Sequence, residues 1–120
     1  ELGVLELDLF DTELLYGTKL LQEKAARLDY GQSLMTHAMV LVGVDLSADG
    51  KPKQWRVENS WGEAVGEAGY LTMTDAWFDQ YVYEVAIDKQ YIGKDVLDLL
   101  GTPATVLDPW DPMGSLAIAE

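Results

Sequence analysis

No cysteine occurs among the 120 residues of this sequence, and there is a single histidine. The absence of cysteine excludes a disulfide framework and agrees with a reducing compartment. A zinc site is disfavoured for the same reason, because zinc is held mainly by cysteine and histidine side chains. Stability must therefore come from an apolar core, and a share of 48% apolar residues is sufficient for one domain.

Basic residues are also scarce: 8 lysines and arginines stand against 21 acidic residues, which gives a formal net charge of -13. Such a charge argues against nucleic acids and anionic membrane surfaces as partners, since both repel an acidic protein. No apolar run approaches the roughly 18 residues that span a bilayer, and the start of the chain lacks the basic region of a secretory signal. We therefore predict a cytoplasmic protein. Because the sequence does not begin with methionine, we expect it to be a piece of a longer one.

The residue pattern alternates between strand-like and helix-like segments, which predicts a mixed α and β fold. In the first half, an extended run over 4–10 leads to a helix over 12–28, with Asp11 at its N-cap and Gly31 after its end. A strand follows over 36–46, and nearly all of its central residues are apolar. A strand of this kind is typically covered on both sides.

The second half continues with short elements and closes on a segment that holds three prolines. That last segment, 102–120, predicts an extended arm, and 1–101 remains as the folded domain. Asp75 is placed to cap a short helix. The elements predicted in this half are a strand over 53–60, a glycine-rich loop over 62–69, a strand over 70–74, a helix to residue 81, a strand over 82–87 and a helix over 94–100.

The pairing with the most chemical content is His37 and the tetrad Asn59-Ser60-Trp61-Gly62, which begins 22 positions later. An imidazole that is oriented by a neutral side-chain amide is the equipment that activates a thiolate. A neutral amide suffices because a thiol beside an imidazolium already ionises near neutral pH. Each of these residues alone has a more common structural explanation. Taken together they predict half of a thiol-protease site, the half without the thiol.

The two side chains come together if the strands that carry them form a hairpin. A turn centred near Ala48 pairs residues whose numbers sum to 96, which places His37 directly opposite Asn59 with Cβ atoms about 5 Å apart. A tight turn at 49–50 gives a sum of 99 and shifts the pairing by three residues. The sequence leaves both registers open. In either one we expect Asn59 Oδ1 to accept a hydrogen bond from His37, and Trp61, on the same strand face as Asn59, to cover that bond.

Longer stretches around this motif share one resemblance. They are 35–40 (Met-Thr-His-Ala-Met-Val), 55–63 (Trp-Arg-Val-Glu-Asn-Ser-Trp-Gly-Glu), 69–75 (Gly-Tyr-Leu-Thr-Met-Thr-Asp) and 110–117 (Trp-Asp-Pro-Met-Gly-Ser-Leu-Ala). Together they resemble the C-terminal part of the aminopeptidase C and bleomycin hydrolase group, a cytosolic branch of the papain-like cysteine peptidases. The first two stretches are typical of papain-like enzymes in general, whereas their combination with the last two is much narrower.

The resemblance implies a papain-like α+β fold, in which an antiparallel β half-barrel carries the site between an N-terminal helix and a C-terminal arm. It implies that His37 is the general base and acid, that Asn59 orients it and that Trp61 shields their hydrogen bond. The catalytic cysteine and the oxyanion glutamine of the family lie in an N-terminal portion with no counterpart here, so we expect the isolated chain to be inactive. The implied partners are a peptide substrate, that missing portion and further copies, since the family forms homohexamers.

The C-terminal arm carries a second implication of the resemblance. In the family this arm folds back into the cleft, and its terminal carboxylate meets the free amine of the substrate. The stretch 114–117 matches the family's ending and points to Ala117, but three residues follow it and extend to Glu120. They move the carboxylate by up to about 10 Å along an extended chain. Trimming of these residues, a different path of the arm and an altered specificity all stay open.

Two other classes of function also stay open: a non-catalytic interaction or scaffold domain derived from the same fold, and an unrelated small acidic binding protein. A nucleotide site is not predicted, because the loop 62–69 lacks a strand-GxGxxG-helix context. The carboxylates of Asp45, Asp49 and Glu58 are scattered, so we expect them to be solvated rather than to hold a metal. No cofactor is predicted.

Overall fold

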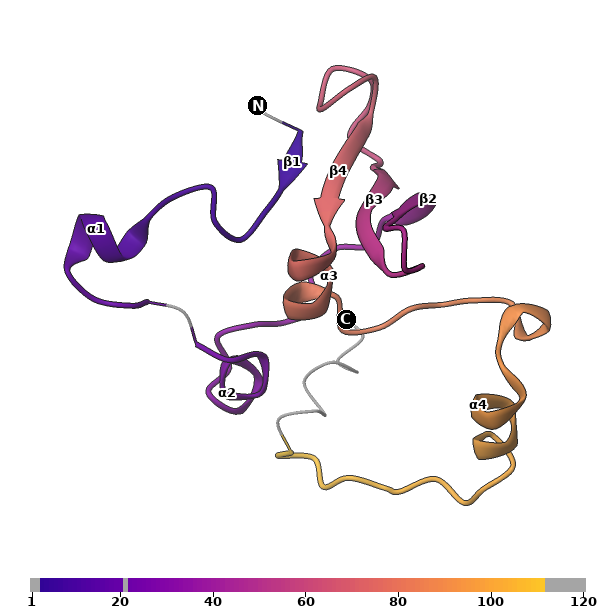
Figure 1. Ribbon diagram of the computed structural model, residues 1–120. Coiled ribbons are helices and arrows are strands. Elements are labelled where there is room, and N and C mark those ends of the chain that lie inside the picture. Colours follow the sequence, from indigo (N-terminus) through magenta and orange to yellow (C-terminus); the bar gives the residue numbers. More distant parts are fainter. Residues whose placement is uncertain (1–2, 21, 112–120) are drawn as a thin grey trace. The chain divides into compact units, whose positions relative to one another are not determined.

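The computed structural model describes residues 3–20 and 22–111, and Figure 1 shows its helices and strands. The described residues fall into two compact units, one formed by 3–20, 22–24 and 36–82 and the other by 25–35 and 83–111. The elements in chain order are β1 (Val4–Leu5), α1 (Thr12–Tyr16), α2 (Lys24–Asp29), β2 (Val40–Leu46), β3 (Pro52–Glu58), β4 (Tyr70–Thr74), α3 (Asp75–Tyr81), η1 (Lys89–Tyr91) and α4 (Lys94–Leu99).

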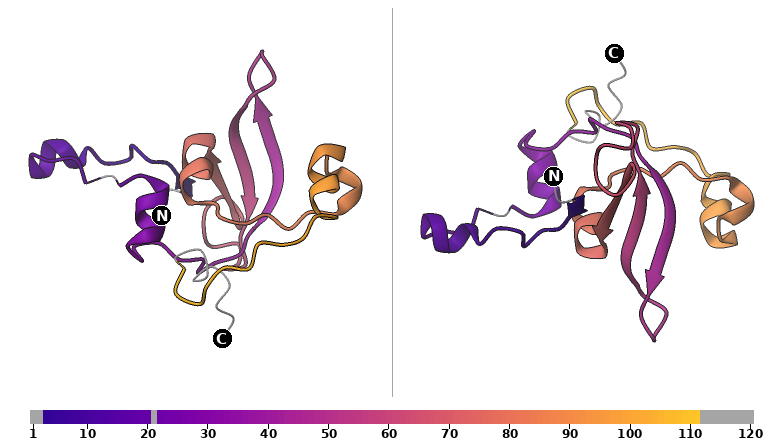
Figure 2. Two further views of the ribbon diagram at one scale, coloured as in Figure 1. Left: turned by 90° about the horizontal axis from the view of Figure 1, so that it is seen from below. Right: turned by 90° about the horizontal axis from the view of Figure 1, so that it is seen from above.

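The first unit is built on a 4-stranded sheet in the order β1-β4-β3-β2. β2 and β3 form an antiparallel hairpin, β4 is antiparallel to β3, and the short β1 is parallel to β4. Figure 2 shows the hairpin as a long twisted pair of strands that ends in its turn. The two hairpin strands are shorter than predicted, since the first begins at Val40 and the second ends at Glu58. Both predicted site residues therefore lie just outside the ladder.

The hairpin turn selects one of the two registers. Gly50 has a φ of 80°, a conformation that suits glycine, and the Ser47 N–H donates to Lys51 O at 2.8 Å. Asp45 pairs with Gln54, so that the residue numbers sum to 99. The register with a sum of 99 is therefore confirmed for residues 43–45, and the register with a sum of 96 is wrong. The turn itself is one residue longer than the predicted turn at 49–50, because Ser47 and Lys51 close it and a second irregularity follows between Asp45 and Leu46.

A β-bulge lies between Leu41 and Gly43, where an extra residue enters β2. Beyond the bulge the pairs sum to 98, and the ladder ends with Val40 opposite Glu58. The prediction that His37 stands directly opposite Asn59 in the ladder is therefore wrong, because this register leaves His37 three residues ahead of the last pair, Val40 and Glu58.

The core of this unit lies between the sheet and α3. Among the described residues, the buried apolar side chains are Val57, Leu71 and Met73, and Val57 is 0% exposed. Val57 pairs with Leu71 in the ladder, so the two share one face of the sheet. Trp77 and Phe78 of α3 pack against this face. The half-buried sheet explains why apolar and polar residues alternate along β3 and β4.

Trp55 ties β3 to α3. Its ring stacks on Phe78 with centroids 4.8 Å apart, and its Nε1 donates to Asp75 Oδ1 at 2.8 Å. The N-cap of the helix is Thr74, whose hydroxyl accepts from the Trp77 N–H at 3.3 Å. The prediction of Asp75 as the cap is therefore wrong by one residue, because its carboxylate binds the indole instead.

The single helix predicted over 12–28 is wrong, and the structure holds α1 and α2 in its place. Gly17 ends α1 in the left-handed conformation with a φ of 67°, and its N–H donates to Glu13 O at 2.8 Å. A helix that closes in this way does not continue in the same direction. The predicted N-cap is confirmed, since Asp11 Oδ1 accepts from the Leu14 N–H at 2.8 Å.

The second unit contains most of α2, the 3-10 helix η1 and α4. The start of α4 at Lys94 agrees with the prediction. The strand predicted over 82–87 is wrong, because Val82 closes α3 by donating its N–H to Phe78 O at 3.0 Å and the residues after it pair with no described strand. In the described part of the chain, no helix is long and apolar enough to cross a membrane.

The arm predicted over 102–120 is described as far as residue 111. Residues 102–111 form no helix or strand, which agrees with an extended segment. Ala117 and Glu120, for which we predicted a role near the substrate amine, lie outside the described residues.

The loop over 62–69 joins β3 to β4 through close backbone contacts. Gly66 has a φ of 65°, and a Cβ at this position would collide with the carbonyl oxygen of Tyr70. The chain at Gly3 passes directly over Gly66, and the Thr72 N–H donates to Gly3 O at 2.9 Å. Both space and conformation therefore require glycine at position 66, as expected for a loop that crosses between strands.

Gly66→Ala is expected to lower the free energy of unfolding by about 3 kcal/mol or more, because a strained φ and an overpacked site add up. Gly50→Ala is the matched control: its φ is also positive, at 80°, but nothing lies within 4 Å of the added methyl group. We expect this control to cost only about 1 to 2 kcal/mol. Urea denaturation followed by circular dichroism measures both. Equal costs would show that the loop shifts to accept the methyl group.

Candidate active site

His37 and Asn59 come together at the end of the β2–β3 hairpin that lies away from its turn. His37 precedes β2 by three residues, and Asn59 is the first residue after β3. The distance from His37 Nε2 to Asn59 Oδ1 is 2.8 Å, which is a good hydrogen bond. The expected contact is therefore made, although neither residue belongs to the ladder that was predicted to pair them.

Asn59 is 8% exposed and is held by main-chain groups. Its own N–H donates to Gly69 O at 3.1 Å, because the glycine-rich loop returns to the end of β3. Its Oδ1 accepts a second hydrogen bond from the Ser60 N–H at 2.8 Å. The sequence did not predict these two partners, Gly69 O and the Ser60 N–H, because they are main-chain atoms, which every residue has. The run of glycines over 62–69 was the signal that a close loop returns here.

Trp61 covers one face of the imidazole. The rings of His37 and Trp61 are stacked, with centroids 4.9 Å apart and an angle of 26° between their planes. We predicted that Trp61 lies on a strand face, and this is wrong. The indole comes from the turn after β3, because β3 ends at Glu58. Trp61 is 62% exposed, so the rest of the indole is open to solvent.

A hollow of about 270 Å³ adjoins the pair. His37 itself is exposed, and its Nδ1 makes no hydrogen bond to the described residues. The site can therefore hold the ring through Nε2 and exchange a proton through Nδ1 with a group from outside the chain. The residues that line the hollow are Ala38, Met39, Val40, Glu58, Asn59 and Ser60.

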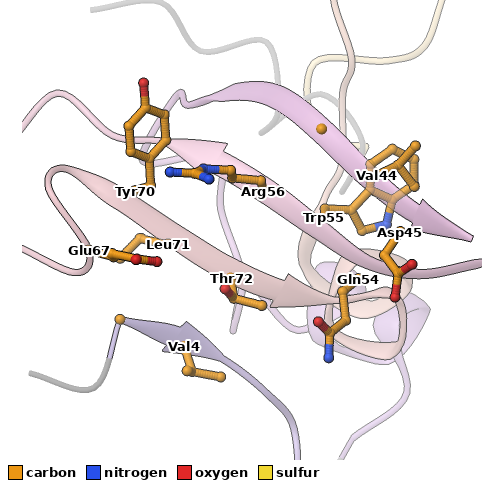
Figure 3. A pocket seen from close by; sticks show the side chains of 12 residues that line it. Val4, Val44, Asp45, Gln54, Trp55, Arg56, Glu67, Tyr70, Leu71 and Thr72 are labelled. Carbon is orange, nitrogen blue, oxygen red and sulfur yellow. The ribbon is translucent and has the colours of Figure 1, made fainter.

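A larger groove of about 410 Å³ lies over the sheet on the face that points away from α3. Figure 3 shows Arg56 reaching toward Tyr70, and the guanidinium carbon lies 4.2 Å from the centre of that ring. None of His37, Asn59 and Trp61 lines this groove. Although it is larger, it lacks the imidazole and its orienting amide, so the smaller hollow is the better candidate.

Two of the three acidic side chains that we considered for a cation site are bound to lysines. Asp45 pairs with Lys53 and Asp49 with Lys51, each at 3.3 Å. Hydrogen bonds to the Asp49 carboxylate hold its pKa below the ordinary value; the Ser47 hydroxyl contributes most, followed by the Lys51 side chain. Within 3–20 and 22–111, no three possible metal ligands gather at one place.

Comparisons with known proteins show which family this chain belongs to. The model of the Peptidase C1-like family matches residues 1–114. Aminopeptidase C from Streptococcus thermophilus is 50% identical over 115 residues, which are 96% of this chain and 26% of that protein. Bleomycin hydrolase from Gallus gallus is 51% identical over 121 residues, and the match covers 98% of this chain and 26% of that protein.

A solved structure shows the same fold. The crystal structure of PepW from Lactobacillus rhamnosis HN001 matches with a TM-score of 0.83 and 55% identity, over 97% of this chain and 26% of that one. The predicted papain-like α+β fold is therefore confirmed. The chain spans about a quarter of the length of these relatives, since each match covers 26% of the other protein. It belongs to the peptidase C1-like family, and it corresponds to the C-terminal portion of aminopeptidase C and bleomycin hydrolase.

Proposed function

We propose that this chain supplies the histidine and the asparagine of a Cys-His-Asn acyl-transfer site in a cytoplasmic cysteine aminopeptidase. The observation that carries the proposal is the 2.8 Å hydrogen bond between His37 Nε2 and Asn59 Oδ1. Membership of a peptidase family and the names of its relatives support it. The nucleophile and the oxyanion donor come from the rest of the protein, because this chain has no cysteine.

In the proposed reaction, a thiolate attacks the carbonyl carbon of the scissile peptide bond. His37, as the imidazolium, gives its Nδ1 proton to the leaving amine. The neutral ring then takes a proton from the water that hydrolyses the thioester. Asn59 keeps the ring in place through both steps, since Nε2 stays hydrogen-bonded while Nδ1 gains and loses its proton. The amide needs no charge for this task.

A chimaera tests the proposal: this chain replaces the matching quarter of Streptococcus thermophilus aminopeptidase C. We expect the chimaera to hydrolyse aminoacyl fluorogenic amides. His37→Ala is expected to lower kcat/KM by about 10³-fold or more, because proton transfer is lost. Asn59→Ala is expected to lower it by roughly 10²-fold, because the ring loses its orientation. The isolated chain is expected to give no turnover that thiol-directed inhibitors block.

Arg56→Ala is the control for these variants, because Arg56 lies in the groove on the other face of the sheet. We expect it to leave kcat/KM of the chimaera unchanged. Activity that survives His37→Ala would overturn the proposal. A folded chimaera without activity would instead favour the non-catalytic scaffold function.

We further propose that β2 is the surface that contacts the rest of the protein, which assembles as a homo-oligomer. All seven residues of β2 are exposed. Leu41 and Val44 pair with Val57 and Trp55, so they continue the core-facing side of the sheet, but they are 36% and 46% exposed. Apolar edge strands of this kind are covered in stable proteins. About three quarters of the relatives' length, 100% less 26%, is available to cover it.

Val44→Lys is expected to change the unfolding free energy of the isolated chain by no more than about 0.5 kcal/mol, since the side chain is exposed there. In the chimaera we expect it to lower the melting temperature, because the added charge is then buried against the rest of the protein. Gln54→Lys, on the other face of the neighbouring strand, is the control. Equal melting temperatures for the two chimaera variants would contradict the assigned surface.

For the C-terminal arm we propose that its terminal carboxylate binds the free amine of the substrate. Ala117 and Glu120 lie outside the described residues, so this proposal rests on the match of 114–117 to the family's ending. Removing residues 118–120 from the chimaera is expected to raise kcat/KM for substrates with a free amine relative to N-acetylated ones, because the carboxylate returns to Ala117. An unchanged ratio of the two kcat/KM values would refute the arm's role.

A further inference from the structure

The carboxamide of Asn59 receives two hydrogen bonds on one oxygen. Oδ1 lies 2.8 Å from the Ser60 main-chain nitrogen and 2.8 Å from His37 Nε2. A carbonyl oxygen has two lone pairs, so it can accept both bonds at once. The main-chain nitrogen of Ser60 is thus linked to the imidazole through a single atom.

Ser60 settles which end of the carboxamide faces the ring. A main-chain N–H can only donate, so the atom beside it must be the oxygen. Rotation of the amide by half a turn would place its NH₂ group against the N–H of Ser60, donor against donor. Because Asn59 is 8% exposed, solvent is not at hand to satisfy the groups that such a rotation would leave unpaired.

The other end of the same amide exerts no comparable control. Nδ2 of Asn59 is buried and has no hydrogen-bond partner among the described residues. The orientation of this side chain is therefore set at its oxygen, by Ser60 on one side and His37 on the other. Since the ring nitrogen can be either donor or acceptor, only Ser60 imposes a direction.

We propose that the main-chain N–H of Ser60 is a positioning group that sets the tautomer of His37. With its oxygen turned toward the ring, Asn59 requires Nε2 to carry the proton. In the neutral imidazole Nδ1 is then bare, which is the form that the base of the proposed function needs. The inference rests on that function for its catalytic meaning, but not for its test. The side chain of Ser60 takes no part.

Imidazole ¹⁵N spectroscopy of the full 120-residue chain tests this directly, because His37 is the only histidine. We expect a protonated Nε2 and a bare Nδ1 in the neutral ring. Replacing the peptide bond between Asn59 and Ser60 by an ester removes the N–H, and we expect a mixture of both tautomers and exchange of the ring N–H with water up to roughly tenfold faster. Ser60→Ala keeps the N–H and is expected to match the unmodified chain.

A second background separates this effect from a general loss of structure. In Asn59→Asp both terminal atoms of the side chain are oxygens, so there is no orientation left to set, and the ester is expected to change the tautomer no further. Protection of the residue 59 N–H, which donates to Gly69 O at 3.1 Å, reports that the loop is intact.

A neutral ring that carries its proton on Nδ1 in the unmodified chain would overturn the inference without any variant. An ester that leaves the tautomer and the exchange rate unchanged would overturn it as well, as would a Ser60→Ala variant that behaves like the ester. None of these results bears on the activity of the chimaera, which tests the proposed function separately.

Discussion

The hydrogen bond between His37 Nε2 and Asn59 Oδ1 is the contact on which the site depends. It joins His37, which precedes β2, to Asn59, which follows β3. It therefore forms only when the hairpin ladder holds the start of β2 beside the end of β3. The loop over 62–69 then holds Asn59 from behind through Gly69 O. A polar contact between two side chains is thereby supported by main-chain bonds, which do not depend on rotamers and lose little entropy when the site is used.

The rest of the first unit packs against the hairpin and stabilises it. α3 covers β3 and β4 on one face, and Trp55 joins them by stacking on Phe78 and by its hydrogen bond to Asp75. The cover stops before β2, where apolar side chains stay exposed. This is the packing expected of a part of a larger protein, and it is the reason for the proposal that β2 contacts the rest of that protein.

Local signals predicted the elements that local forces control. The strand over 70–74, the N-cap at Asp11 and the start of the last helix at Lys94 follow from periodicity and capping residues, and the structure has all three. The predictions failed where a single backbone feature overrides periodicity. Gly17 stops a helix whose apolar spacing continues, and the residues after Val82 pair with none of the strands in the part of the chain that the structure describes. A β-strand exists only with a partner, which a pattern of side chains does not specify.

For the site, the residue types predicted which side chains meet: an imidazole, a neutral amide and an indole at 37, 59 and 61, whatever the register that joins them. Only the tertiary structure decided how they meet. The turn and the bulge set the register, the turn after β3 brings Trp61 onto the ring, and the N–H of Ser60 turns the amide. The physical reason is that these choices are made by main-chain atoms, which every residue possesses and whose directions are defined only once the chain has folded.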